Sequence, residues 1–213
     1  MTKEIIYSSS DISAIILSAG KSGRYGSPKA LISFDEKHSF LQKIALEYFD
    51  SGVRNIVLVI NSEIEKEILN EICTLPKEMK ITVVINPHPE EGRFSSIRLA
   101  VNAIGDSQNV FIQNIDNPFT TAELLTKMLD KSGEGDFIVP VYHGTNGHPV
   151  LISEIVLKHI LAMKSDVGNL REVLEKFKSV NVEFFDPNIL ANINTLEEYS
   201  KYFNLKIDYE KVN

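Results

Sequence analysis

The chain has 213 residues, of which 43 % are hydrophobic and 24 % charged, and its formal net charge is −7. A chain of this length buries a core of ordinary size, so we expect residues 1–213 to form a single domain. The acidic balance argues against a general nucleic-acid or anionic-membrane surface, because either partner favours clustered Lys and Arg. The single cysteine, Cys73, excludes an intramolecular disulfide and a multi-thiolate metal site. We expect Cys73 to be a small apolar core residue.

No segment approaches the roughly 18 apolar residues that a membrane-spanning helix needs. Residues 1–10 contain no apolar stretch long enough for a signal peptide. We therefore expect a cytoplasmic protein without a membrane partner.

Short β-branched runs alternate with amphipathic stretches along the chain, which predicts an α/β fold with a mostly parallel central sheet flanked by helices. The predicted strands are 12–17, 55–60, 81–85, 110–115, 136–142 and 148–152, the last two joined by a turn at 143–147. Predicted helices follow Ser39, Ser62 and Thr120, and further helices are expected at 153–163, 168–177 and 195–203. Three residue pairs at these helix starts have capping-box spacing: Ser39 and Gln42, Ser62 and Glu65, Thr120 and Glu123.

Polar residues follow four of the predicted strands. The loop at 19–28 follows the first strand, and Asn61, Asn86 and Asp116 follow the next three. In open α/β sheets, ligands bind at the carboxyl ends of the strands. We therefore expect these residues to share the rim of an active site.

The loop Leu17-Ser-Ala-Gly-Lys-Ser-Gly-Arg-Tyr-Gly-Ser-Pro-Lys29 is the strongest functional signal in the sequence. Its three glycines allow backbone N–H groups to approach an anion without obstruction by a Cβ atom. Lys21, Arg24 and Lys29 add positive charge, so the loop suits a triphosphate whose pyrophosphate departs as an anion. The alternative is a flexible surface connection with solvated charges.

Two familiar phosphate-binding motifs do not fit this loop. A Walker A motif ending at Gly20-Lys21-Ser22 would need its first glycine at position 15, which is Ile15. The glycines are spaced as G-x-x-G-x-x-G, which is not the dinucleotide fingerprint. Generic kinase, ATPase and NAD-binding functions are therefore disfavoured.

The same loop resembles the nucleotidyltransferase signature L-A-A-G-x-S-x-R-M-G-x-P-K, with Ser18 in place of an Ala and Tyr25 in place of the usual Met. The nearest branch is the molybdenum cofactor cytidylyltransferases, which are related to the molybdopterin guanylyltransferases. The resemblance implies a Rossmann-like nucleotidyltransferase fold, with Arg24 and Lys29 as catalytic contacts to phosphates. It implies that the nucleotide contacts in this loop are Leu17, Ser18, Ala19, Gly20, Lys21, Ser22 and Gly23.

Later segments match the same branch in the same order, from about residue 12 to 203. Asn86-Pro87 and Gly92–Ser96 are similar to N-P…G-x-S-S-S, and Asp116-Asn117-Pro118 is similar to the metal motif D-M-P, with Asn in place of Met. Three further similarities are Gly147–Val150 to G-H-P-V, Ser165–Arg171 to G-D-x-G-x-R, and Asn192–Thr195 to D-I-D-T.

The resemblance implies Mg²⁺ as the cofactor, with Asp116 as its main ligand. Mg²⁺ prefers carboxylate and phosphate oxygens and usually needs only one or two protein carboxylates. Asn194 stands where cytidylyltransferases often have a second Asp, and it offers only a neutral oxygen. Guanylyltransferases resemble Asn-x-Asn-Thr in this segment, so Asn192 and Asn194 are compatible with activity. The alternatives are that Asp116 and Asn194 cap helices or form turns.

The remaining candidate residues form two groups, one predicted to contact the nucleotide and the other the acceptor. Asn61, Asn86 and Ser95 are predicted nucleotide contacts, and Ser96, His148 and Asp166 are predicted acceptor contacts. Each residue has a structural alternative. The Asn residues could form turns, and His148 could be a structural residue of a strand. Asp166 could cap a helix, and the two serines could cap a helix that starts near Ile97.

These residues predict in-line attack by an acceptor phosphate oxygen on the α-phosphorus of an NTP, with release of pyrophosphate. The acceptor phosphate is already anionic, so positioning and charge stabilisation suffice without a strong general base. The resemblance implies CTP as the favoured NTP, with GTP as the alternative, and an acceptor of the molybdopterin type. It also implies a transient contact with a molybdoenzyme, which would receive the product. A sugar phosphate or an isoprenoid-precursor phosphate is the next acceptor class. A non-catalytic cofactor-binding or delivery module is the alternative outside enzymes, motivated by Asn117 and Asn194.

Overall fold

The computed structural model describes residues 12–20, 27–105, 107–163 and 168–203. Its strands are β1 (Ile12–Ser18), β2 (Asn55–Ile60), β3 (Lys80–Ile85), β4 (Asn109–Asn114), β5 (Phe137–Tyr142), β6 (Thr145–Asn146), β7 (Val150–Ser153) and β8 (Ser179–Glu183). Its helices are α1 (Phe40–Asp50), α2 (Glu65–Ile72), α3 (Arg93–Ala103), α4 (Ala122–Leu129), α5 (Glu154–Ala162), α6 (Leu170–Leu174) and α7 (Leu196–Phe203). Short 3₁₀ turns are η1 (Lys29–Leu31), η2 (Ser62–Ile64), η3 (Pro89–Glu91) and η4 (Pro187–Leu190).

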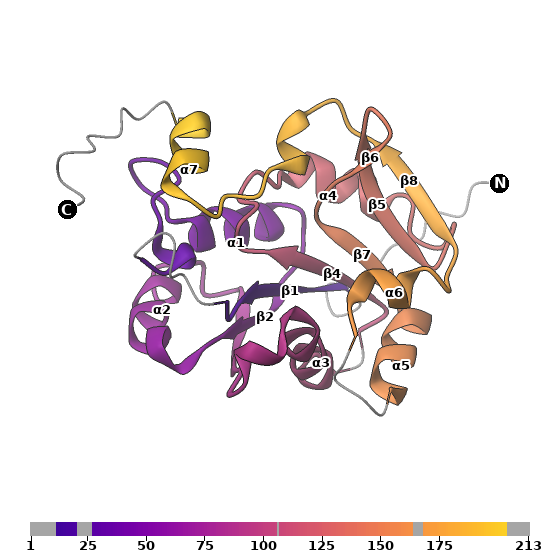
Figure 1. Cartoon of the computed structure of the whole chain (residues 1–213), viewed down its shortest axis with the longest axis horizontal. Helices are drawn as coiled ribbons and strands as arrows, with labels where there is room; N and C mark the ends of the chain where they lie inside the picture. Colours follow the sequence, from indigo (N-terminus) through magenta and orange to yellow (C-terminus); the bar gives the residue numbers. More distant parts are fainter. Residues whose placement is uncertain (1–11, 21–26, 106, 164–167, 204–213) are drawn as a thin grey trace.

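The strands form one sheet in the order β3-β2-β1-β4-β7-β5-β6, and β8 pairs with β5 (Figure 1). Strands β1 to β4 are parallel to one another, whereas β7 is antiparallel to both β4 and β5. The chain runs outward from β1 to β2 and β3 and then returns to the other side of β1 as β4. This reversal of strand order between β1 and β4 is the place where open α/β sheets bind ligands. The predicted Rossmann-like α/β fold is confirmed.

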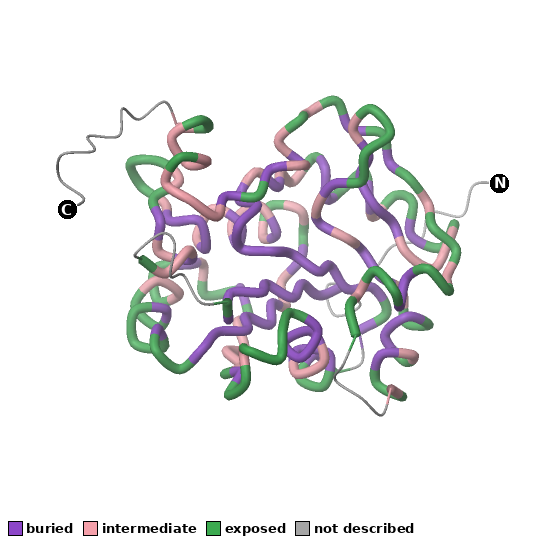
Figure 2. The backbone as a smooth tube through the Cα atoms, in the orientation of Figure 1, coloured by how far each residue is buried: buried purple, intermediate pink, exposed green. Residues whose placement is uncertain are grey.

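Helices cover both faces of the sheet, and the central strands between them are buried (Figures 1 and 2). Each face packs one set of alternate strand residues. Ala14 and Ile16 of β1 pack with α1 and α4, while Ile15 and Leu17 pack with α3 and α5. Every residue of β1 is therefore buried, which explains why the strand is almost continuously apolar. Each fully buried Ile contributes about 1.5–3 kcal/mol of transfer free energy.

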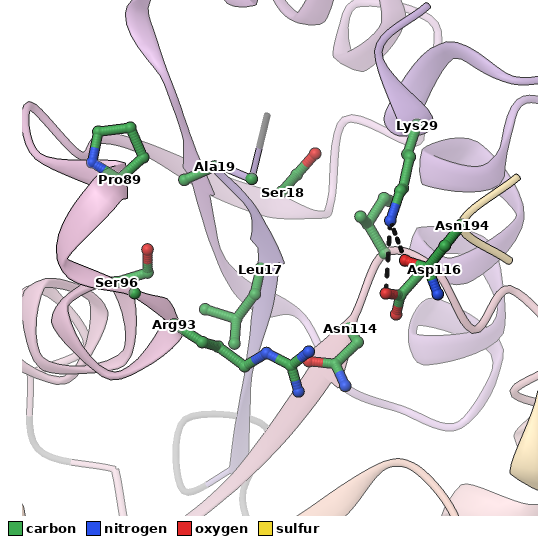
Figure 3. A pocket seen from close by; sticks show the side chains of 13 residues that line it. Leu17, Ser18, Ala19, Lys29, Pro89, Arg93, Ser96, Asn114, Asp116 and Asn194 are labelled. Atoms are coloured by element: carbon green, nitrogen blue, oxygen red, sulfur yellow. Dashed lines mark hydrogen bonds and ion pairs between the residues drawn. The ribbon is translucent and has the colours of Figure 1, made fainter. Parts of the chain in front are cut away.

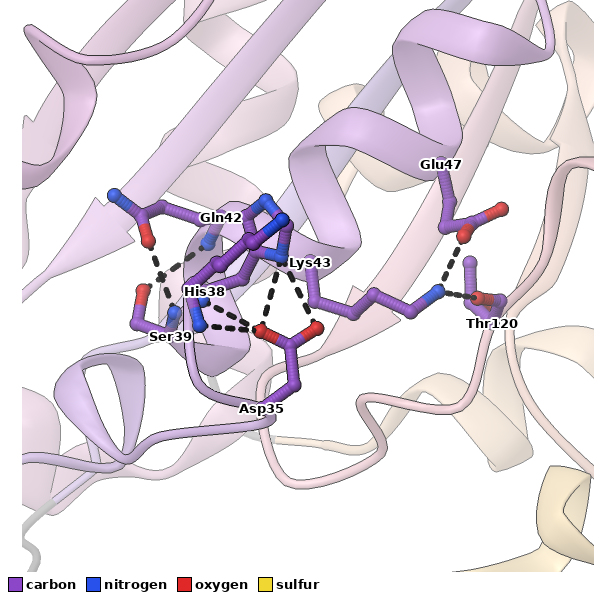
Figure 4. A network of polar contacts seen from close by, with 8 residues as sticks. Asp35, His38, Ser39, Gln42, Lys43, Glu47 and Thr120 are labelled. Atoms are coloured by element: carbon purple, nitrogen blue, oxygen red, sulfur yellow. Dashed lines mark hydrogen bonds and ion pairs between the residues drawn. The ribbon is translucent and has the colours of Figure 1, made fainter.

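The start of α1 follows the predicted capping box. Ser39 Oγ accepts a hydrogen bond from Gln42 N at 3.2 Å, and Ser39 N donates to Gln42 Oε1 at 2.9 Å (Figure 4). Further along the helix, Lys43 forms an ion pair with Glu47, and Lys43 Nζ donates to Thr120 O at 3.4 Å. These contacts tie α1 to the segment between β4 and α4, which also carries Asp116.

The other two predicted capping boxes are wrong. Asn61 precedes η2, and its Oδ1 accepts from Glu63 N at 3.0 Å, so the chain makes a 3₁₀ turn before α2 begins. Thr121, not Thr120, caps α4. The Thr120 hydroxyl is buried and donates instead to Gln113 Oε1 at 2.9 Å.

Four other features of the structure differ from the expectations. The turn after β5 leads first to β6, with φ of 46° at His143 and 77° at Gly144, and the chain reaches β7 only afterwards. Helix α6 is shorter than predicted, and β8 was not predicted because its residues are mostly exposed at the sheet edge. Cys73 is exposed rather than in the core.

Within the described ranges, no helix combines the length and apolar character needed to cross a membrane.

Gly147 allows the segment before β7 to pass close to η4. Gly147 N donates to Pro140 O at 2.7 Å, and His148 N donates to Ile189 O at 2.9 Å. A Cβ atom at position 147 would lie 2.7 Å from Ile189 Cγ1 and 2.8 Å from Ile189 O. Only a residue without a side chain therefore fits at this contact.

We expect Gly147→Ala to lower the free energy of unfolding by about 1–3 kcal/mol, because the methyl group forces two packed segments apart. Urea denaturation measures this change. Gly144→Asn is the control, since Gly144 has open space around it and Asn tolerates a positive φ. Equal stability of the Gly147→Ala variant and the unmodified chain would contradict the close contact.

Candidate active site at the sheet switch point

A cavity of about 220 Å³ lies at the carboxyl ends of β1 and β4. Residues from β1, from the start of α3, from the end of β4 and from the segment before α7 surround it (Figure 3). The lining residues are Leu17, Ser18, Ala19, Gly20, Lys29, Pro89, Gly92, Arg93, Ser96, Asn114, Ile115, Asp116 and Asn194. Segments distant in sequence thus meet at the switch point of the sheet.

Lys29 connects two of the predicted metal ligands. Its Nζ atom donates to Asn194 Oδ1 at 2.5 Å and lies 3.6 Å from Asp116 Oδ2 (Figure 3). The Lys29 and Asp116 side chains are only 18 % and 12 % exposed, so solvent screens this ion pair less than one on the surface. Asp116 Oδ1 is buried and has no hydrogen-bond partner within the described part of the chain.

Two buried amides fix the turn that carries Asp116. Gln113 Nε2 donates to Asn114 O at 2.9 Å and to Asn117 O at 2.8 Å, one carbonyl on each side of Asp116. Gln113 Oε1 in turn accepts from the hydroxyls of Tyr48 and Thr120. Burial raises the pKa of Tyr48, whose protonated hydroxyl donates to Gln113 Oε1 at 3.2 Å. The turn is therefore held by a network in which both the nitrogen and the oxygen of the Gln113 amide have partners.

Asn117 fastens the late segment of the chain to the same turn. Its Nδ2 lies 3.2, 3.1 and 2.7 Å from the carbonyl oxygens of Asn188, Ile189 and Ala191. The backbone adds a bond from Ile193 N to Asp116 O at 2.8 Å. These bonds bring the segment before α7 beside Asp116, and Asn194 with it.

Helix α7 holds Asn194 in place from the other side. Glu198 Oε2 accepts from Asn194 N and Thr195 N, while Thr195 Oγ1 accepts from Glu198 N at 3.1 Å. Thr195 is thus the capping residue, and the Asn194 side chain is directed to Lys29 instead. Phe203 at the end of α7 contacts an aromatic cluster made of Phe34, Phe40, Phe119 and Tyr199.

Asn86 organises the loop before α3. Its Nδ2 donates to Ser95 Oγ at 3.0 Å and to Ser96 Oγ at 2.9 Å, and its Oδ1 accepts from His88 N at 2.8 Å. Both serines lie inside the first turn of α3, which begins at Arg93, so neither caps a helix near Ile97. Ser96 lines the 220 Å³ cavity, whereas Asn86 and Ser95 line a separate hollow.

A second cavity, of about 410 Å³, adjoins the first and contains His148. It is lined by Arg93, Phe94, Ile97, Ile112, Asn114, His148, Val150, Gly168, Asn169, Leu170 and Arg171. Arg93 and Asn114 belong to both cavities. Burial lowers the pKa of His148 below 6.5, against a smaller opposing effect of Asp116, and the charge of Arg93 lowers it further.

The structure brings together eight of the predicted site residues and separates others from them. The first cavity contains Leu17, Ser18, Ala19, Gly20, Lys29, Ser96, Asp116 and Asn194. His148 lies in the second cavity, and the Asn61 side chain is bonded within its own turn and to Ala19 O at 3.4 Å. The predicted contacts Lys21, Ser22, Gly23, Arg24 and Asp166 lie outside the described residues.

Two residues of the site were not predicted from the sequence. Asn114 ends the otherwise apolar strand β4, and a polar residue at a strand end is a signal that could have identified it. Arg93 occupies the variable position of the segment that resembles G-x-S-S-S, where the resemblance gives no indication of its role. Its positive charge next to a glycine at the start of a helix was the available signal.

The donor atoms at the first cavity suit a hard cation. Among the described residues, no three His, Cys, Asp or Glu side chains gather as a metal site. Asp116 is nevertheless buried, and one of its carboxylate oxygens lacks a protein partner in the described ranges. Asn194 Oδ1 is a second oxygen donor beside it. One carboxylate with a neutral oxygen fits Mg²⁺, which takes its remaining ligands from water and substrate phosphates.

A family model and named relatives of this chain point to the same protein family. A model of the MobA-like NTP transferase domain matches residues 14–181. The molybdenum cofactor cytidylyltransferase of Escherichia coli (strain K12) is 27 % identical over 200 residues, which cover 89 % of this chain and 94 % of that protein. A Bacillus mycoides (strain KBAB4) protein named "Probable molybdenum cofactor guanylyltransferase" is 27 % identical over 203 residues, with the same coverage.

A solved structure supports the fold. The crystal structure of Rv0371c from Mycobacterium tuberculosis H37Rv superposes with a TM-score of 0.76 at 18 % identity, covering 92 % of this chain and 98 % of that one.

We expect Asn117→Leu to lower the free energy of unfolding by about 1–3 kcal/mol, because carbonyl oxygens that now accept from Asn117 lose a buried donor. Urea denaturation tests this, with Asn102→Leu on the exposed side of α3 as the control. Similar losses in the two variants would contradict the role of Asn117 in holding the late segment.

We expect the unfolding free energy to depend on pH through His148. Its pKa in the folded chain lies below 6.5, so the unfolded chain takes up the proton first and stability falls as the pH drops below about 6.5. Comparing unfolding free energies at pH 7.5 and 5 isolates this effect, because His148→Gln should lose less stability than the unmodified chain. Parallel pH profiles would contradict a half-buried His148 that stays neutral in the folded chain.

Proposed function

Because this chain belongs to the family of MobA-like NTP transferase domains, we propose that it transfers CMP from CTP to the phosphate of a molybdopterin-type acceptor and releases pyrophosphate. The chain is a nucleotidyltransferase related to molybdenum cofactor cytidylyl- and guanylyltransferases. The observation that carries this proposal is the meeting of the β1 strand end, Lys29 and Asp116 in one cavity at the sheet switch point.

The first cavity takes the nucleotide in this proposal. The segment from Leu17 to Gly20 lines this cavity at the end of β1, and Lys29 supplies a cation within reach of the same space. Among the described residues, no atom lies within 4 Å of the position that a Cβ atom would take at Gly20, which leaves room there for a phosphate against the backbone. Lys29 stabilises the charge that develops as pyrophosphate leaves.

Mg²⁺ is the proposed cofactor, held by Asp116 and Asn194. When bound, it neutralises phosphate charge and polarises the phosphorus that is attacked. Asp116 offers the buried oxygen that has no protein partner in the described ranges, and Asn194 Oδ1 now accepts from Lys29. Lys29 therefore keeps the two oxygen donors together until the metal and nucleotide bind.

The second cavity takes the acceptor. Arg93 and Arg171 give it positive charge, and its described lining includes no Asp or Glu, so it favours an anion. Phe94, Ile97 and Leu170 provide an apolar surface for a flat ring system. Because the two cavities share Arg93 and Asn114, an acceptor phosphate in one can reach the α-phosphorus in the other.

The base preference rests on the loop resemblance. Ala19 and the Gly92–Ser96 segment favour CTP, while Asn192 and Asn194 favour GTP as the second candidate. A relative of each type has the same 27 % identity, so overall similarity does not separate them. A cytoplasmic location and transient transfer of the product to a molybdoenzyme belong to the same proposal.

Pyrophosphate release tests the proposal, measured with molybdopterin and each NTP in turn, with and without Mg²⁺. We expect turnover with CTP that requires Mg²⁺ and molybdopterin together. Lys29→Ala should reduce it by about 100-fold or more, the usual cost of losing a group that stabilises developing charge.

Lys158→Ala is the matched control, because Lys158 is 69 % exposed on α5 and pairs only with Glu154 among the described residues. Preference for GTP would select the guanylyl alternative. Equal pyrophosphate release with and without molybdopterin, or full activity of Lys29→Ala, would contradict the proposed reaction.

A further inference from the structure

Arg93 stands on the boundary between the two cavities. It is the first residue of α3 and follows Gly92, whose φ of 97° turns the backbone into the helix. Figure 3 shows its guanidinium group directed toward the amide of Asn114, the other residue that lines both cavities. A single cationic side chain therefore borders both spaces.

Among the residues that the structure describes, no carboxylate pairs with the charge of Arg93. Within the described part of the chain, Arg93 forms neither a hydrogen bond nor an ion pair, whereas Lys29 faces Asp116 at 3.6 Å. Asp116 is the one acidic residue that the described lining of the two cavities contains. Arg93 is thus a cation available to an anionic ligand.

The electrostatic effect of Arg93 extends into the second cavity. Alongside burial, its positive charge lowers the pKa of His148, which lines that cavity. Because Arg93 lines both cavities, its charge acts on both spaces.

Two anions must meet at this boundary for the proposed reaction to occur. An acceptor phosphate oxygen forms a bond to the α-phosphorus, the bond from that phosphorus to the oxygen bridging to the β-phosphate breaks, and pyrophosphate leaves with the electron pair. Repulsion between the two phosphates opposes this approach, so a cation between them lowers the barrier.

We propose that Arg93 is a catalytic residue that binds the α-phosphate of the NTP and the phosphate of the acceptor at the same time. This inference rests on the proposed function and assigns to it the residue that joins the two substrates. Arginine suits the role because its planar fork presents several N–H donors to two oxyanions, and it keeps its charge throughout. No proton is transferred to or from it.

Two variants separate charge from geometry. Arg93→Met removes the charge, and Arg93→Lys keeps the charge but replaces the fork by a single ammonium group. Arg93 is exposed at the start of a helix, so neither change disturbs the core. Lys158→Met, which removes one charge from the exposed face of α5, is the control for net charge.

The first measurement is pyrophosphate release with molybdopterin and whichever of CTP or GTP the unmodified chain uses. We expect Arg93→Met to lower kcat/KM for the acceptor by about 100-fold or more, with Arg93→Lys recovering only part of this loss. The affinity for the α,β-methylene analogue of the same NTP, measured by calorimetry without acceptor, should change far less than turnover. Unchanged turnover, or a loss explained fully by weaker nucleotide binding, would overturn the bridging role.

The second measurement does not depend on turnover. With the α,β-methylene analogue already saturating, added inorganic phosphate should raise the Tm of the unmodified chain and of Lys158→Met, but not that of Arg93→Met. An equal rise in all three proteins, or none in the unmodified chain, would overturn the inference. Absence of pyrophosphate release by the unmodified chain contradicts the proposed function instead, and the phosphate measurement still decides the role of Arg93 as an anion ligand.

Discussion

The buried amides of Gln113 and Asn117 hold the turn on which the whole site depends. Gln113 bonds the carbonyl oxygens of Asn114 and Asn117, and so fixes the chain on both sides of Asp116. Asn117 then fastens the late segment near Ile189 to this turn. Lys29 completes the arrangement through its contacts with Asp116 and Asn194. Buried polar groups are costly unless they are bonded, so the network favours one arrangement of three segments that are far apart in sequence.

This network changes how two unusual residues are interpreted. Asn117, in place of the Met of the D-M-P motif, is fully buried and donates to late backbone carbonyls, so its identity has a structural cause. It therefore no longer favours a non-catalytic delivery module. Asn194 keeps an oxygen donor beside Asp116 and accepts from Lys29. The site thus has one carboxylate where the cytidylyl pattern has two, and cationic side chains line both cavities.

Much of the sheet was predictable from the sequence, because β1, β2 and β4 are buried on both faces and their apolar runs are almost uninterrupted. Strand β8 was not, since its mostly exposed residues show no such pattern. Local spacing also failed at Thr120, whose hydroxyl serves Gln113 across the core instead of capping α4. The positions of Asp116 and of the glycine loop could be predicted, because each directly follows a strand of the predicted parallel sheet. The second cavity and the position of Arg93 did not, because they depend on how α3, α6 and β7 come together.

In the proposed function, Asp116 forms a metal site that the nucleotide completes. Manganese can replace magnesium at sites built from oxygen ligands, and its EPR spectrum reports binding directly. The decisive measurement is an EPR titration of Mn²⁺ with the α,β-methylene analogue of CTP or GTP, on the unmodified chain and on Asp116→Asn. We expect Mn²⁺ binding that is tight only when the nucleotide is present and that is lost in Asp116→Asn. Equal Mn²⁺ binding by the two proteins, or binding that the nucleotide does not change, would contradict it.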